Sequence, residues 1–75
     1  MMISENLSTR LSFLRKEAGI SQDELGKVVG VTQIAISDIE RGKKLTSIKV
    51  VLALAKYFNT SVDYLLGVSD IRERR

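Results

Sequence analysis

The 75-residue sequence predicts an all-α fold, a compact domain of five short helices. Apolar residues recur at intervals of three and four, which is the spacing of one helical face. Proline is absent, and serine or threonine precedes most of these segments, while glycine or asparagine follows them as helix caps do. The segment KVVLALAKYF is the best case for a strand, but its length and its lysines favour a helix. We expect one domain over residues 1–68 and a short basic tail over residues 69–75.

The first helix is predicted from apolar residues on one face. Leu7, Leu11, Leu14 and Ala18 follow one another at steps of four, three and four residues. Gly19 comes directly after them and is expected to end the helix in a left-handed conformation.

The second helix begins with a capping box. Ser21 is followed three residues later by Glu24, and the apolar stripe after them is Leu25, Val28 and Val29. Gly30 ends the helix. Gly26 lies in mid-helix, where glycine costs about 1 kcal/mol relative to alanine, so we expect the next helix to cross there and to require a small residue.

Three further helices follow with the same kind of caps. The third begins after Thr32, turns Ile36 and Ile39 inward and stops at Gly42. The fourth begins after Ser47, ends at Asn59 and has the following apolar residues: Val51, Leu52, Leu54, Ala55 and Phe58. The fifth runs from Ser61 to Gly67 with Tyr64, Leu65 and Leu66.

The composition argues against catalysis, metal binding and a membrane span. Histidine and cysteine are both absent, so no imidazole can activate a nucleophile and no thiolate can bind a metal. We therefore expect no catalytic residues, no metal and no cofactor. No apolar stretch reaches 18 residues and no secretory signal pattern is visible, so the expected location is the cytoplasm.

The charges are unevenly distributed along the chain. The net charge is +3, and from Arg41 to Val62 there are five bases and no acid, whereas Glu17 to Glu40 holds five acids and Lys27 alone as a base. A basic run of this kind is compatible with nucleic acid, and equally with a solvated surface.

The second and third helices are separated by a short turn, Gly30 to Thr32, as in a helix-turn-helix. An ordinary helical hairpin is the alternative. The stretch LRKEAGISQDELGKVVGVTQIAISDIERGKKLTSIKVVLALAKYFNTSVDYLLG, Leu14 to Gly67, resembles the lambda-repressor-like family, also called Cro-type or xenobiotic-response-element-type. This resemblance implies a five-helix DNA-binding domain whose third helix enters the major groove.

The sequence departs from that family at three points. Gly26 stands where alanine is more common, and no proline precedes the fourth helix. Ile34 and Asp38 occupy outward positions where relatives often have longer polar or basic residues. The base preference of relatives therefore does not carry over to this chain.

Candidate base readers share one face of the third helix. At 100° per residue, that face holds Gln33, Ile34, Ser37, Asp38 and Arg41, opposite the inward isoleucines. Glutamine pairs with adenine, isoleucine can cover a thymine methyl, serine bonds several base edges and aspartate accepts from cytosine. Two alternatives stay open: Ile34 as a surface or dimer contact, and Asp38 as an exposed acid.

Candidate phosphate contacts surround the same helix. The family resemblance implies one at Gln22, and Thr32 at the start of the third helix is another. The loop after the third helix adds Arg41, Lys43 and Lys44, and Arg10 is a weaker candidate. We expect modest non-specific affinity with a steep salt dependence.

The resemblance also implies a buried ion pair between Arg15 and Glu40. Both residues lie beside an apolar face of helices that are expected to pack together. Glu40 is therefore predicted to stabilise the fold rather than to read a base.

The predicted function is a sequence-specific regulator of transcription that binds double-stranded DNA. The preferred form is a repressor, phage-type or autoregulating, that binds a palindromic operator as a homodimer with recognition helices roughly 34 Å apart. The alternative is an antitoxin or a restriction-modification controller, and a toxin or an antirepressor remains open as a protein partner. The candidate dimer surface comprises Val62, Tyr64, Leu65, Val68 and Ile71, although these residues could equally close the core.

Overall fold

The computed structural model describes residues 3–43 and 46–73, and within them it contains five α-helices. Their bounds are α1 Ile3–Ala18, α2 Gln22–Val29, α3 Gln33–Glu40, α4 Ile48–Phe58 and α5 Val62–Leu65. The predicted all-α fold is confirmed. No helix in the described part of the chain is long and apolar enough to cross a membrane.

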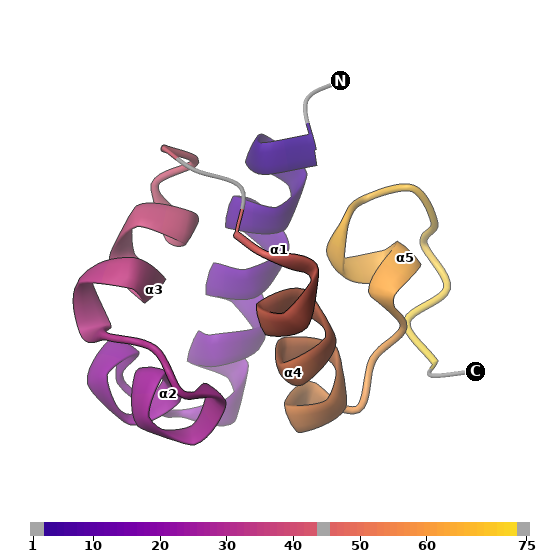
Figure 1. Ribbon diagram of the computed structural model, residues 1–75. Helices are drawn as coiled ribbons and strands as arrows, with labels where there is room; N and C mark the ends of the chain where they lie inside the picture. The colour runs from indigo at the N-terminus through magenta and orange to yellow at the C-terminus, as the bar shows by residue number, and fades with distance from the viewer. Residues whose placement is uncertain (1–2, 44–45, 74–75) are drawn as a thin grey trace.

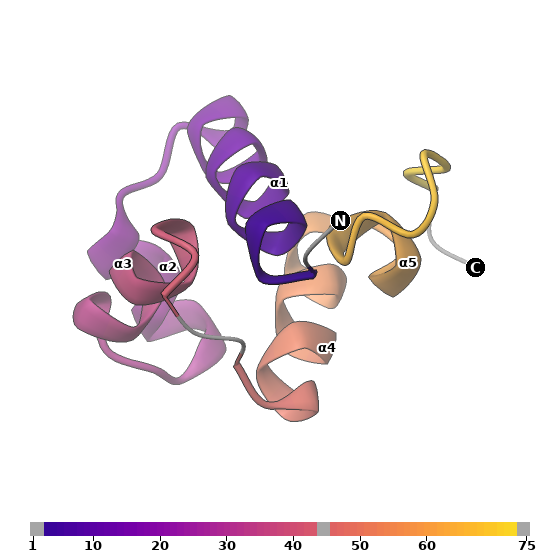
Figure 2. The same ribbon diagram turned by 90° about the horizontal axis from the view of Figure 1, so that it is seen from above.

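The helices pack around α1, which runs through the middle of the molecule (Figure 1). The pair α2 and α3 lies on one side of α1, and α5 lies on the other. Helix α4 lies between α2 and α5 and contacts both, as the view from above also shows (Figure 2). The result is a rounded domain of 27 × 23 × 22 Å.

The helix starts agree with the caps that the sequence predicts. Ser21 Oγ accepts from the Glu24 amide at 3.0 Å, and the Glu24 carboxylate accepts from the Ser21 amide at 3.1 Å, which completes the capping box. Thr32, Ser47 and Ser61 cap α3, α4 and α5 in the same way. Side-chain oxygens thus satisfy amides that have no partner inside the helix.

Left-handed residues end α2 and α4. Gly30 closes α2 with φ 82°, and Asn59 closes α4 with φ 54°. Among the described residues other than glycine, Asn59 is the one with positive φ. Asparagine tolerates this conformation because its short side chain can bond to the nearby backbone.

The core joins all five helices. Its buried apolar residues are Leu7, Leu11, Leu14, Leu25, Ile36, Ile39, Val51, Leu54, Ala55 and Leu65. The predicted inward positions of Ile36 and Ile39 are confirmed.

Three apolar residues that were expected inside are exposed. Val28 is 56% exposed because it faces a groove in which the opposing residue of α4 is the short Ala53. Leu52 is 52% exposed because the buried Val51 fixes the inward direction of α4, and Leu52 lies 100° away from it. Ala18 is exposed in the last turn of α1.

Gly26 is required by the turn that follows α2. A Cβ atom at this position would lie 2.7 Å from the Val31 carbonyl oxygen and 3.2 Å from the Thr32 carbonyl carbon and oxygen. The Gly26 carbonyl also accepts from the amides of Gly30 and Val31. The expectation of close packing is thus correct, but the close neighbour is the turn backbone rather than a side chain of α3.

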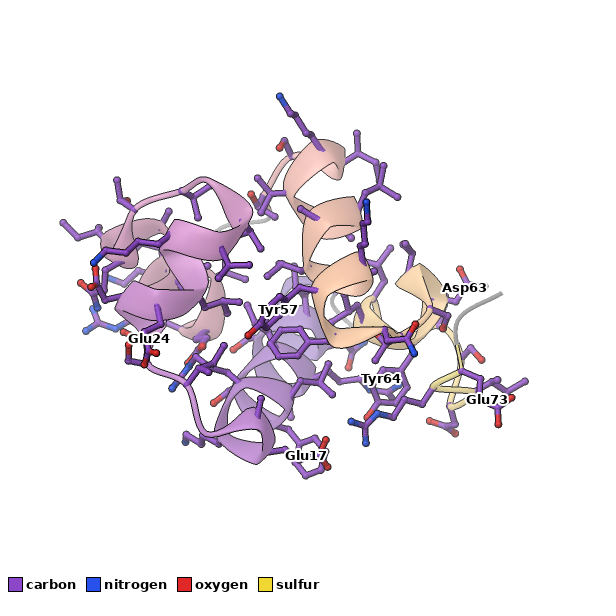
Figure 3. The ribbon with its side chains drawn as sticks, turned by 90° about the horizontal axis from the view of Figure 1, so that it is seen from below. Glu17, Glu24, Tyr57, Asp63, Tyr64 and Glu73 are labelled. Atoms are coloured by element: carbon purple, nitrogen blue, oxygen red, sulfur yellow. The ribbon has the colours of Figure 1, made fainter. Side chains whose placement is uncertain are left out.

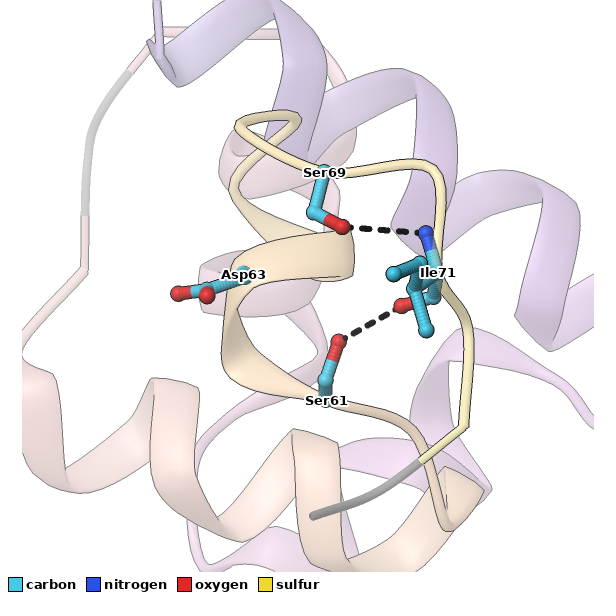
Figure 4. A pocket seen from close by; sticks show the side chains of 4 residues that line it. All are labelled: Ser61, Asp63, Ser69 and Ile71. Atoms are coloured by element: carbon cyan, nitrogen blue, oxygen red, sulfur yellow. Dashed lines mark hydrogen bonds between the residues drawn. The ribbon is translucent and has the colours of Figure 1, made fainter.

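Residues 69–73, which we call the C-terminal strap, run beside α5 and reach α1. The Ser61 amide donates to the Arg72 carbonyl at 3.0 Å, and Thr60 and Glu73 form an isolated antiparallel bridge. Ser61 Oγ donates to the Ile71 carbonyl, while Ser69 Oγ accepts from the Ile71 amide (Figure 4). Arg72 pairs with Glu17 of α1.

Candidate nucleic-acid interface

The helix-turn-helix places α3 with one face outward. Gln33 and Ile34 are exposed, Ser37 and Asp38 are partly covered, and the inward face is closed by buried isoleucines. Thr32 Oγ1 accepts from the Ala35 amide at 3.1 Å, which fixes the start of the helix. The four candidate base readers therefore lie along one accessible face, with the first two the most open to a partner.

Ile34 is the most exposed large apolar side chain among residues 6–43 and 46–73, at 68%. It lies on α3, beside the amide of Gln33 and away from the core. An isolated apolar residue at a protein surface is common and needs no explanation. In a helix-turn-helix, an exposed apolar residue on the outward face of the second helix is also of the chemical type that can contact a thymine methyl.

The ion pair between Arg15 and Glu40 joins α1 to α3. Arg15 Nε donates to Glu40 Oε2 at 2.6 Å, and a second guanidinium nitrogen donates to Oε1 at 3.0 Å. The Glu40 side chain is 7% exposed. Its hydrogen bonds raise the pKa of Arg15 above the ordinary value, against the opposing effect of desolvation, so the guanidinium stays charged. Arg15 also donates to the Ile20 carbonyl at 2.9 Å.

Gln22 connects this ion pair to the outward face of α3. Its Nε2 donates to Glu40 Oε1 at 3.2 Å, and its Oε1 accepts from Gln33 Nε2 at 2.7 Å. Sequence reasoning missed the contact between the two glutamines. The available signal was that each is the first residue of its helix, one on either side of the turn.

The candidate phosphate contacts are unequally placed. Arg41 and Lys43 are exposed in the loop that follows α3, and Thr32 lies at the start of that helix. Gln22 is half-buried with its amide engaged as described, and Lys44 lies outside the described residues.

Arg10 does not belong with these cations. Its guanidinium donates to the carbonyls of Tyr64 at 2.9 Å and Ser69 at 2.8 Å, and to Asp70 at 2.8 Å. Its Cζ also lies 4.3 Å from the centre of the Tyr64 ring. We therefore correct the expectation for Arg10, because these contacts tie α1 to α5 and the strap instead of leaving the side chain for a phosphate.

The candidate dimer surface also needs correction. Leu65 is fully buried because α5 turns it into the core, so it cannot contact a second copy. Val62 and Tyr64 are partly covered by packing against the core. Val68 and Ile71 are exposed, and Ile71 lines a small pocket of about 60 Å³ with Ser61, Asp63 and Ser69 (Figure 4).

Sequence reasoning missed an exposed apolar ridge on α4. Ile48 and Leu52 lie one turn apart on this helix, and both are more than half exposed. Ala53 and Tyr57 face α2, so the helical period places the ridge on the flank of α4 that is turned away from α2. The helical period alone assigned Leu52 to the core.

Comparisons with known proteins give the following similarities. A family model described as "Helix-turn-helix" matches residues 11–65. The chain is 40% identical over 65 residues to repressor protein C2 of Salmonella phage P22, which covers 87% of this chain and 30% of that protein. It is 31% identical over 65 residues to the ImmF control region 10 kDa protein of Bacillus phage phi105, covering 87% and 72% of the two chains.

Two solved structures have the same arrangement of helices. The crystal structure of the P22 c2 repressor in complex with a synthetic operator gives a TM-score of 0.78 at 38% identity, over 92% of this chain and 98% of that one. The restriction-modification controller protein C.AhdI from Aeromonas hydrophila gives a TM-score of 0.76 at 27% identity, over 83% of this chain and 94% of that one.

Proposed function

Because the chain belongs to the helix-turn-helix family of DNA-binding transcriptional regulators, we propose that it is a repressor that inserts α3 into the major groove of an operator. The observation that carries this proposal is the outward face of α3, where Gln33 and Ile34 are exposed beside each other. The proposal assigns the chain no catalytic step and no cofactor. A regulator of this kind acts where the genome lies, so we assign it to the cytoplasm.

Gln33 and Ile34 are the proposed principal base readers. The Gln33 amide offers a donor and an acceptor, which together match the edge of adenine, and the apolar Ile34 matches the methyl group of thymine. Ser37 and Asp38 lie one turn further along α3 and are half-buried, so they are proposed as secondary contacts.

Cationic and polar residues around α3 supply the proposed phosphate contacts. Arg41 and Lys43 are exposed after the helix, and Thr32 lies at its start, where backbone amides favour an anion. Gln22 can hold a phosphate with the one amide hydrogen that it does not give to Glu40. Lys44 remains a sequence-based candidate outside the described residues.

We further propose that the chain binds a palindrome as a homodimer. The ridge of Ile48 and Leu52 and the exposed Val68 provide apolar surface for such a contact. Helix-turn-helix dimers place two recognition helices one DNA turn apart, roughly 34 Å.

The role of Ile34 is tested by shortening its side chain and, separately, by removing the methyl group of the thymine base. Operator sites are first selected from random DNA with the purified chain, and the affinity of Ile34→Ala is then measured on sites with thymine or uracil at each position. We expect Ile34→Ala to lose about tenfold in affinity on the thymine site, or about 1.4 kcal/mol, and little on the matching uracil site, which lacks the methyl group.

The matched control for this experiment is Lys16→Ala, an exposed substitution on α1. The ratio of its affinities for thymine and uracil sites should equal that of the parent chain. An equal loss for Ile34→Ala on both kinds of site would contradict direct contact with a thymine methyl.

A second candidate function is that of a controller of restriction and modification genes. The observation that favours it is the similarity to the Aeromonas controller protein, with a TM-score of 0.76. Mapping bound sites in the source genome separates the two functions. Sites upstream of restriction or methyltransferase genes would favour the controller, and sites among phage lysis and immunity genes would favour the phage-type repressor.

A further inference from the structure

A groove lies between α2 and α4, on the flank of α4 that faces away from α5. It is lined by Val28, Val29, Ala53, Lys56 and Tyr57 and has a volume of about 360 Å³. Figure 3 shows Tyr57 on the side of α4 that faces α2. None of the lining residues belongs to α3 or to α5, so the groove is separate from the proposed base-reading face and from the proposed dimer ridge.

The walls of this groove are apolar and open to solvent. Val28 is exposed although its position in α2 follows the period of a buried residue, and Tyr57 is 41% exposed. The floor between them is Ala53, whose methyl group is too short to fill the space. Exposed apolar side chains that line a shared concave surface are typical of a binding site rather than of scattered surface residues.

The aromatic wall is held in place before any partner arrives. The Tyr57 ring packs edge-on against Phe58, with ring centres 5.0 Å apart and an interplanar angle of 80°. Phe58 in turn packs against the core. Because the Tyr57 ring is already ordered, a partner that covers it loses little additional side-chain freedom.

The rim of the groove is cationic. Lys49, Ala53 and Lys56 recur at i, i+4 and i+7 on α4, which places both lysines on the stripe that borders the groove, and α4 has no acid. On α2, Lys27 is paired with Asp23 at 3.2 Å, so these two charges offset each other. Glu24 lies one turn before Val28 on α2, and its carboxylate accepts from the Ser21 amide. The two lysines of α4 outnumber this one acid, so the groove carries a net positive charge and a complementary partner carries carboxylates.

We propose that this groove binds an acidic amphipathic segment of a partner protein. Apolar side chains of that segment pack between Val28 and Tyr57, and its flanking carboxylates pair with Lys56 and Lys49. This is the arrangement by which an amphipathic helix lies in a groove between two helices. The proposal goes beyond DNA binding and does not depend on it.

The test uses a displayed library of amphipathic helical peptides, selected against the full chain. In the library, two positions one turn apart vary among apolar residues, and the flanking positions vary among Glu, Gln and Lys. We expect enrichment of Glu at the flanking positions. Binding of the enriched peptides should weaken at least tenfold in Tyr57→Ala and in Lys56→Glu, and a peptide with Lys in place of Glu should restore binding to Lys56→Glu.

Lys16→Glu is the matched control, because it reverses an exposed charge on α1 outside the groove and should leave peptide binding unchanged. Lys56→Glu alters only an exposed side chain, so thermal unfolding should show that it folds like the parent chain. Failure to enrich any peptide, enrichment of Gln or Lys, or equal binding by Lys56→Glu would overturn the proposal. So would dissociation of a dimer by Tyr57→Ala in sedimentation, since the groove would then belong to a second copy of the chain.

Discussion

Gly26 shows how one missing methyl group sets the geometry of the helix-turn-helix. Alanine normally stabilises a helix relative to glycine by about 1 kcal/mol. Here the added Cβ would lie 2.7 Å from the Val31 carbonyl oxygen, and backbone cannot move aside as a flexible side chain can. We predict that Gly26→Ala destabilises the chain by about 1 to 3 kcal/mol, as overpacking does, when measured by urea unfolding.

Lys27→Ala is the control for this measurement, because it changes the next residue of the same helix at an exposed position. It should change the free energy of unfolding by no more than about 0.5 kcal/mol, which is the typical contribution of an exposed ion pair. A stabilised Gly26→Ala variant would mean that the turn can relax away from α2.

Thr60 carries a hydroxyl group that is buried without a hydrogen-bond partner among the described residues. A buried polar group of this kind costs about 1 to 3 kcal/mol. Valine has nearly the same shape but no hydroxyl, so we predict that Thr60→Val stabilises the chain by about 1 kcal/mol, measured as a higher midpoint of unfolding. Thr60→Ser keeps the hydroxyl and loses the methyl group, so it should destabilise; a gain for serine or a loss for valine would contradict this account.

At the scale of elements, the ion pair of Arg72 with Glu17 attaches the C-terminal strap to α1. The hydrogen bonds from Arg72 lower the pKa of Glu17 below its ordinary value of about 4.3. A lowered pKa contributes stability that is complete above the ordinary value and is lost as the pH falls through the lowered pKa. We therefore predict that Glu17→Gln melts at a lower temperature than the parent chain at pH 7, and that the difference disappears towards pH 2.

Arg72→Gln removes the same ion pair from the other side. Its melting temperature should follow that of Glu17→Gln across the pH range. A difference that persists unchanged at low pH would show that the effect of Glu17 does not come from its charge.

The helices were predictable because their boundaries depend on local chemistry. The side chains of Ser21, Thr32, Ser47 and Ser61 each accept from the amide three residues further on, and the residue types that make such contacts can be recognised in the sequence. Burial was less predictable. Leu52 follows the apolar period of α4, yet its exposure depends on where α5 and α2 lie against that helix, which is set by tertiary packing.

In the candidate site, too, local features could be predicted from the sequence and tertiary contacts could not. Sequence reasoning could place Gln33 and Ile34 on one face, because the period of a helix fixes relative directions. It could not assign Arg10, whose partners Tyr64 and Ser69 are more than 50 residues away along the chain. Contacts between residues so far apart in the sequence depend on the complete fold. The sequence alone therefore suggested a phosphate contact for Arg10, whereas in the structure its guanidinium binds α5 and the strap.

At the scale of the whole molecule, the fold separates three surfaces. The outward face of α3 is the first, the ridge of Ile48 and Leu52 on the flank of α4 away from α2 is the second, and the groove by Tyr57 between α4 and α2 is the third. The proposed contacts with DNA, with a second copy and with a protein partner are therefore assigned to three different surfaces.

Dimerisation through the ridge predicts a specific effect of Leu52→Glu. A charge in an apolar contact must lose its hydration, so the variant should sediment as a monomer at concentrations where the parent chain is a dimer. It should also lose affinity for a palindrome while keeping its affinity for a half-site. Phe13→Glu, at an exposed apolar residue of α1, is the control and should remain dimeric. A dimeric Leu52→Glu variant would place the interface elsewhere.

The hydrogen bonds from Arg15 through Glu40 and Gln22 to Gln33 can run in one direction only. A guanidinium can only donate and a carboxylate can only accept, so Gln22 must turn its NH₂ group towards Glu40 and its oxygen towards Gln33. Gln33 must then give Gln22 an N–H, which leaves its own oxygen and one N–H free. Two charges buried beneath the surface thus fix which way round an exposed amide is presented, and its free acceptor and donor are the pair that the major-groove edge of adenine requires.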